Sequence, residues 1–401
     1  MVPLAITGLG IVSPFGIGRA AFFAALAEPE AAMERAFSGP RHVLSDARFA
    51  RARLAEVPDF DPAQFLGDKG LRNLDRATKM LVVAAKHALE DAGLKRDGEF
   101  IGSAPERMGI CAATAYGSLD SITEINRVAE LEHPRYLNPS RFPNTVINAP
   151  AGYVSIWEGL EGPNVTVVDG NCGGADVVLT AETHLSCGRA DALLVGGFEV
   201  LNEPLYLAFE KLGVISEGDS FSSPGEVASR GTHLGEGAVL MVLESADAAR
   251  ARGARLLGEV VGFGSAFEPP ASAAQLVHAS DKAVERALRA ALLDASLEPG
   301  AIDLVLCAES GVNRMDMAEE EGLARVFGSD VATVATKALW GETFGAAAAF
   351  GMAAALSWFA SDRPAPLLRG ELVGPVRTAL VMAMGYYGNV SVVIVRKASW
   401  Q

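Results

Sequence analysis

Residues 166–176 read TVVDGNCGGAD. The β-branched run at 166–168 predicts a strand, and the Asp-Gly-Asn stretch that follows predicts a tight turn. Cys172 comes next, followed by two glycines. The apolar pattern of residues 175–185 then predicts a helix. A thiol at a helix N-terminus is a candidate nucleophile, because the helix dipole lowers its pKa.

Spacing alone leaves two interpretations of Cys172 open. In the first, Gly173 and Gly174 let a substrate carbonyl approach the backbone, where N–H groups bind the oxyanion. In the second, Cys172 is a small buried residue that fills a tight turn. Both interpretations place it at the end of a strand and the start of a helix.

Strand-like and helical patterns alternate around this stretch. They predict buried mixed sheets covered by helices. Two strand-turn units, ADALLVGGFE at 190–199 and RTALVMAMGY at 377–386, resemble each other and suggest an internal pseudo-repeat. We expect strands at 3–12, 107–115, 164–170, 190–200, 235–245, 302–310, 377–385 and 390–397, helices at 74–94, 175–185, 279–297 and after 345, and irregular segments at about 28–58, 117–143 and 215–233.

The composition of the chain argues against several classes of function. The chain has 401 residues, 50% of them hydrophobic, and a net charge of −15, which argues against nucleic-acid binding. Its four cysteines form no CxxC pair and no cluster with histidine at metal spacing. The sequence therefore predicts reduced thiols in the cytoplasm, with no disulfide framework and no metal site.

Two further motifs are rejected. GLGIVSPFG at 8–16 does not fit the G-x-G-x-x-G pattern of a dinucleotide loop. The apolar run LWGETFGAAAAFGMAAALSWFA at 339–360 contains Glu342 and is rich in Gly and Ala, so it predicts a buried helix and no membrane span.

Six ordered stretches resemble the condensing enzymes of the thiolase superfamily, specifically the β-ketoacyl-ACP synthases. The resemblance implies the five-layered αβαβα thiolase fold with two pseudo-repeated halves. Residues 1–250 would form the half carrying Cys172, and 251–401 the half carrying Glu309, Lys337 and Glu342. It also implies a dimer formed along the strand near the nucleophile. The six stretches are 5–16, 60–80, 142–172, 188–199, 235–254 and 337–349.

When the motifs of the family are matched to this sequence, the resemblance implies that Cys172 is the acyl-accepting cysteine. The family follows this cysteine with two histidines, one in H-G-T-x-T and one in K-x-x-x-G-H. Here CAESGVNRMD puts Glu309 in the first position, and KALWGETFGAA puts Glu342 in the second while keeping Lys337. None of the six histidines lies in either motif.

Other positions follow the same resemblance. The family's structural acid has its match in Glu319 or Glu320. MGYYGN at 384–389 matches the glycine-rich C-terminal turn, which puts Gly385 and Tyr386 near the family's gatekeeping Phe. With Gly173, these two residues are the expected oxyanion or tunnel positions.

Two glutamates change the expected chemistry. In the family, the imidazoles donate hydrogen bonds to the thioester oxygen and help to expel CO2 from malonyl-ACP. Ionised glutamates only accept hydrogen bonds, and losing a donor aimed at developing charge costs about 3–4 kcal/mol. We therefore expect decarboxylative condensation by this chain alone to be severely impaired.

Three functions remain compatible with the sequence. The first is a subunit similar to a chain-length factor, paired with an intact ketosynthase in fatty acid or type II polyketide (polyene) elongation. The second is a Cys172-dependent acyltransferase, thioesterase or non-decarboxylative condensing enzyme that uses Glu309 and Glu342. The third is a homodimeric acyl-binding scaffold without turnover. In each case the resemblance implies acyl groups carried on the phosphopantetheine of acyl carrier protein (ACP), and no other cofactor.

Overall fold

The computed structural model describes residues 1–38, 43–44, 49, 52–216, 231–309, 311–328, 330–361, 364 and 366–398. Within these ranges, eleven strands pair into one sheet in the order β13-β12-β14-β15-β11-β1-β10-β8-β6-β7, with β2 beside β1. The strands of this sheet are β1 Leu4–Ser13, β2 Gly16–Ile17, β6 Met108–Ala113, β7 Asn164–Val167, β8 Ala192–Glu199, β10 Gly237–Ser245, β11 Gly258–Phe267, β12 Leu304–Cys307, β13 Thr333–Ala335, β14 Thr378–Met384 and β15 Asn389–Arg396.

The sheet consists of two matching halves. In one, β7, β6 and β8 run parallel and are followed by antiparallel β10 and β1. In the other, β13, β12 and β14 run parallel and are followed by antiparallel β15 and β11. The halves join where residues 4–6 pair with residues 258–260. The resembling stretches 190–199 and 377–386 contain β8 and β14, which occupy equivalent places, so the predicted pseudo-repeat is confirmed.

Helices and two small strand pairs complete the fold. The helices are α1 Arg19–Ala27, α2 Pro29–Ser38, α3 Ala63–Leu66, α4 Arg76–Asp91, α5 Leu119–Arg127, α6 Ala149–Glu158, α7 Gly173–Ser186, α8 Glu203–Lys211, α9 Ala246–Ala251, α10 Asp281–Ala295, α11 Asn313–Phe327, α12 Lys337–Trp340 and α13 Ala347–Ser361. The small pairs are β3 Leu54–Ala55 with β9 Leu234–Gly235, and β4 Lys95–Arg96 with β5 Glu99–Phe100.

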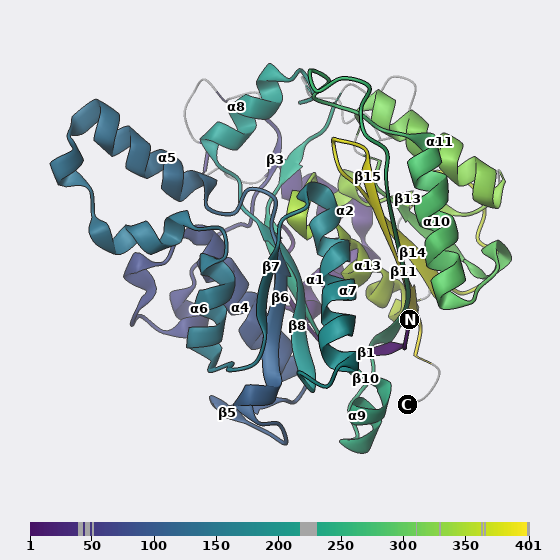
Figure 1. Ribbon diagram of the computed structural model, residues 1–401, viewed down its shortest axis with the longest axis horizontal. Coiled ribbons are helices and arrows are strands. Elements are labelled where there is room, and N and C mark those ends of the chain that lie inside the picture. Colours follow the sequence, from purple (N-terminus) through teal and green to yellow (C-terminus); the bar gives the residue numbers. More distant parts are fainter. Residues whose placement is uncertain are drawn as a thin grey trace.

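Three helical layers and two sheet layers alternate, as expected of the thiolase fold (Figure 1). Helices α7 and α13 lie between the two half-sheets and share one hydrophobic cluster with them. Helices α4 and α6 cover the outer face of the first half, and α10 and α11 cover that of the second. Along β8, Val195 faces the central helices and Leu194 faces α4, so both faces of the strand are buried. This explains the unbroken apolar run in its sequence.

The Ala-rich helix α13 belongs to the core. Residues 344–361 are long and apolar enough to cross a membrane, but 83% of this window is buried inside the fold. A Cβ added to Gly351 would lie 2.7 Å from a methyl group of Val381, so the small residues let the helix pack closely on β14. The prediction of a buried helix is confirmed.

Two of the segments expected to be irregular contain helices. In 28–58, α2 buries Ala32, Ala36 and Phe37 on one face. In 117–143, α5 has Leu119, Ile122 and Ile125 at helical spacing but fully buries none of its residues, and it extends from the body of the molecule (Figure 1). The third segment, 215–233, lies largely outside the described residues.

Candidate active site

Cys172 lies where the sequence predicts it. Strand β7 ends at Val167, the residues Gly170–Cys172 form one 3-10 turn, and α7 begins at Gly173 with Cys172 as its N-cap. Gly170 has φ +55°, a left-handed conformation that favours glycine and allows the sharp turn.

The thiol of Cys172 is nevertheless enclosed. It is 0% exposed, and Sγ lies 3.5 Å from the carbonyl oxygen of Ala383 on β14. Burial, with the nearby carboxylates of Asp176 and Asp169, raises the pKa of the Cys172 thiol well above its usual range. The expectation of a lowered thiol pKa is therefore wrong. The physical reason is the loss of water around the sulfur.

The backbone groups of the Cys172 turn are also engaged in hydrogen bonds. The N–H of Cys172 donates to the carbonyl oxygen of Asp169 at 3.1 Å. Asn389 donates to the same oxygen at 3.3 Å, and its side chain covers Gly385 where a Cβ would stand. An oxyanion at Cys172 would have to displace the internal hydrogen bond of the turn.

The two glycines after Cys172 serve close packing. A Cβ on Gly173 would lie 3.1 Å from the Cβ of Ala113 on β6. A Cβ on Gly174 would lie 2.7 Å from the carbonyl oxygen of Gly345, at the start of the α13 segment. Gly173 thus lets the Cys172 turn pack closely on β6 of its own half, and Gly174 lets it pack on the second half of the fold. A role for Gly173 in oxyanion binding stays a prediction.

Glu342 accepts hydrogen bonds from three donors in the interior of the fold. Its carboxylate accepts Lys337 Nζ at 2.6 Å, Asn171 Nδ2 at 3.0 Å and the N–H of Phe344 at 2.8 Å. Asn171 directly precedes Cys172, so Glu342 links the Cys172 turn to α12. An ionised carboxylate with these partners presents no proton to a substrate oxygen.

Glu309 forms a separate ion pair. It follows β12, is 1% exposed, and lies 2.9 Å from Arg369, which also reaches Glu320 at 3.3 Å. Burial raises the pKa of Glu309 to about 7, although Arg369 acts in the opposite direction. Arg369 is a site residue that the sequence did not reveal, because it lies 60 residues from Glu309 and belongs to no motif used to identify the site.

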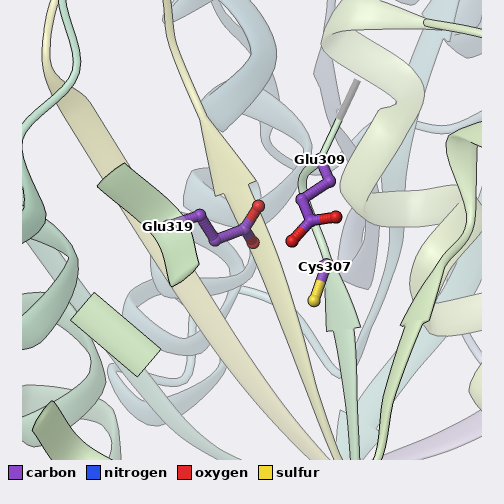
Figure 2. Close-up of side chains that lie close together, drawn as sticks. All are labelled: Cys307, Glu309 and Glu319. Atoms are coloured by element: carbon purple, nitrogen blue, oxygen red, sulfur yellow. The ribbon is translucent and has the colours of Figure 1, made fainter. Parts of the chain in front are cut away.

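The structure distinguishes the two candidate acids after Glu309. Glu319 on α11 is fully buried and accepts the N–H of Ala308 at 2.6 Å. Burial and the adjacent Glu309 raise its pKa well above the usual range. Glu320 has a half-exposed side chain. Glu319 is thus the internal acid, and it faces Glu309 beside Cys307 (Figure 2).

A cavity of about 470 Å³ adjoins the Cys172 turn. Its lining residues Tyr386 and Tyr116 belong to a series of edge-to-face ring contacts that passes behind the wall. Tyr386 packs on Phe209 at 5.4 Å between centroids, Phe209 on Phe344 at 5.0 Å, and Phe344 on Tyr116 at 5.3 Å. The cavity reaches Asn171, one residue before Cys172. It is lined by Ala115, Tyr116, Asp169, Gly170, Asn171, Phe267, Gly385, Tyr386, Tyr387 and Asn389.

Glu199 supports one wall of this cavity and was missed in the sequence. It ends β8, is 1% exposed, and accepts the N–H groups of Ala115 at 2.7 Å and Tyr116 at 3.2 Å. Burial raises the pKa of Glu199 to about 7, although these hydrogen bonds act to lower it. Its only sequence signal is an acid at the end of a buried strand.

Comparison with known proteins identifies the family. A profile of the beta-ketoacyl synthase N-terminal domain matches residues 1–249, and one of the C-terminal domain matches 257–369. The chain is 30% identical over 352 residues to 3-oxoacyl-[acyl-carrier-protein] synthase 2 of Vibrio harveyi, covering 85% of this chain and 82% of the relative. It is 30% identical over 419 residues to the tetracenomycin polyketide synthase ketoacyl synthase beta subunit of Streptomyces glaucescens, covering 98% of each.

A solved structure shows the same fold. The ishigamide ketosynthase/chain length factor aligns with a TM-score of 0.87 and 24% identity, over 99% of both chains. The two domain profiles cover most of the sequence, and the structural match extends over nearly the whole chain. The chain belongs to the beta-ketoacyl synthase family.

Proposed function

We propose that this chain is a chain-length-factor-type subunit that pairs with an intact ketosynthase in ACP-dependent fatty acid or type II polyketide elongation, polyenes included. One observation carries the proposal. Where a decarboxylating ketosynthase has two histidines, this chain has two glutamates, each held in an ion pair: Glu342 with Lys337, and Glu309 with Arg369.

The ion pairs oppose the decarboxylation step. Loss of CO2 from malonyl-ACP leaves an enolate, whose negative oxygen needs donors aimed at it. Glu342 directs its carboxylate at Lys337 and Asn171 and offers a substrate only negative charge. Two unit charges about 4 Å apart repel by about 1 kcal/mol in water and by more near a protein surface. The malonyl carboxylate would meet the same repulsion.

The enclosure of Cys172 supports the same conclusion. Acyl transfer requires a thiolate that the incoming thioester can reach. The Cys172 thiol lies against Ala383 and its pKa is raised, while the adjoining cavity is lined by Asn171 and Tyr386. The cavity is therefore suited to hold part of a chain that is built on another subunit's cysteine.

The sheet edge offers a place for that subunit. Strand β7 ends the sheet, so one side of its backbone has no neighbouring strand within the described residues. Such an edge pairs readily with another chain. Apolar side chains lie exposed around it: Ile156 on α6 is 77% exposed, and Val168 directly after β7 is 50% exposed. The two subunits would pair edge to edge in the cytoplasm.

Co-expression tests the pairing. We would express this chain with an intact ketosynthase from its own source organism and weigh the purified complex by native mass spectrometry. A one-to-one heterodimer is expected, and only this pair should elongate an acyl chain with two-carbon units from malonyl-ACP, releasing CO2. A self-contained homodimer that never captures the ketosynthase would refute the proposal.

A second function is favoured by one feature, the cysteine at the N-cap of α7. Cys172 could accept an acyl group if the turn opens, and the chain would then be an acyltransferase or thioesterase. Incubation with acyl-ACP followed by intact-mass measurement tests this. An acyl adduct that is lost in Cys172→Ala supports the enzyme, and an unmodified chain supports the non-catalytic subunit.

A further inference from the structure

We propose that Cys307, Glu309 and Glu319 form a binding site for a thiophilic divalent metal ion such as Zn²⁺. Cys307 ends β12, Glu309 lies two residues later, and Glu319 comes from α11. The Cys307 sulfur and one oxygen of each carboxylate lie within 4.8 Å of one another, and all three residues are buried. Figure 2 shows the two carboxylates facing each other above the thiol.

Two carboxylate oxygens without hydrogen-bond donors among the described residues, one on Glu309 and one on Glu319, indicate that a ligand binds between them. Oε1 of Glu309 is held by Arg369, and Oε1 of Glu319 by the N–H of Ala308. The second oxygen of each carboxylate is buried and accepts no hydrogen bond from the part of the chain that the structure describes. Leaving a buried polar atom unpaired costs about 1–3 kcal/mol, and more for a charged group. A cation between the two oxygens would satisfy both.

The donor set selects the class of metal. A thiolate with two carboxylates suits Zn²⁺ and its transition-metal neighbours, whereas Mg²⁺ and Ca²⁺ prefer oxygen alone. On binding, the Cys307 thiol and any protonated carboxyl group of Glu309 or Glu319 lose their protons to solvent. One metal–sulfur bond and two metal–oxygen bonds form, with no change in oxidation state. Arg369, paired with Glu309, offsets part of the negative charge of the three ligands.

This site does not depend on the proposed function. The sequence predicts no metal site, because its cysteines have no CxxC or Cys/His spacing. Here the third ligand comes from a helix that folds back onto β12. The same three residues could instead satisfy one oxygen by sharing a proton between the carboxyl groups, and the experiment must separate the two arrangements.

Binding of Co²⁺, which can be followed by absorption, tests the proposed metal site. The full-length chain, treated with a chelator and kept reduced, would be titrated with Co²⁺ and followed by absorption. We expect a thiolate-to-cobalt charge-transfer band that saturates at one Co²⁺ per chain and is displaced by Zn²⁺. Cys307→Ser should abolish the band, and Glu319→Gln should weaken Co²⁺ binding by at least about tenfold.

Cys111→Ser is the matched control, because Cys111 is a buried free cysteine on β6 outside the cluster. It should leave the cobalt band unchanged. If Cys307→Ser fails to fold, the Glu319→Gln titration decides alone. No charge-transfer band in the folded wild-type chain at excess Co²⁺ would overturn the proposal and leave the shared proton as the explanation.

Discussion

Lys337 Nζ lies 2.6 Å from Glu342 Oε2, and both side chains are shielded from solvent beside the Cys172 turn. Removing one partner of a buried ion pair leaves the other charge uncompensated, which costs about 3–5 kcal/mol. We expect Lys337→Met to lower the free energy of unfolding by that amount, measured by urea denaturation. Adding Glu342→Leu to the same chain should restore most of the loss. A Lys337→Met chain as stable as wild type would contradict this account of the pair.

Placing histidines at the two positions that the proposal assigns to the family's catalytic pair should supply part of the chemistry. The double variant Glu309→His with Glu342→His supplies two donors where the chain has acceptors, and each such donor is worth about 10²–10³-fold in rate. We expect decarboxylation of malonyl-ACP to rise at least about 10²-fold over wild type, measured as acetyl-ACP by mass spectrometry. Glu320→His, on the outer side of Arg369, is the control and should leave the rate unchanged.

Alkylation reports whether the Cys172 turn is open or closed. Cys187 is exposed, whereas Cys172 is enclosed and its thiol pKa is raised. With iodoacetamide at pH 7, we expect Cys187 to be modified within minutes and Cys172 only when the chain is unfolded, as read by peptide mass mapping. Labelling of Cys172 at the rate of Cys187 in the folded chain would show that the turn opens readily.

Acid should destabilise the fold through His233. This imidazole is 7% exposed, packs 5.5 Å from the ring of Phe37, and has its pKa lowered by burial to about 4. The unfolded chain binds the proton near pH 6.5 and the folded chain only near pH 4, so stability present above pH 6.5 is lost as the pH falls through this window.

The loss assigned to His233 is up to about 3 kcal/mol, at about 1.4 kcal/mol per pH unit. Urea denaturation at several pH values measures it. In His233→Leu the slope of stability against pH should flatten between pH 4 and 6.5. His133→Leu, which changes an exposed histidine, should keep the wild-type slope. Equal slopes in both variants would remove His233 as the cause.

Local pattern accounts for what the sequence predicts well. β8 and α13 are buried on all sides, so their unbroken apolar runs identify them, and the turn at Cys172 follows from its glycines. The enclosure of that thiol could not be predicted, because Ala383 lies 211 residues away on β14. The role of Arg369 could not be predicted for a similar reason, because only the tertiary fold brings it to its partner Glu309. Helix α5 was missed although Leu119, Ile122 and Ile125 recur at helical spacing, because the helix is only nine residues long.

The contact of Gly174 with the backbone of Gly345 has a further consequence. The family profiles divide the chain at about residue 250, yet this contact packs the start of α7 against the turn that leads into α13, across the two halves. Neither half can keep its central helix packed once the other is lost. The two halves are therefore one cooperative folding unit, and heating should melt them in a single calorimetric transition.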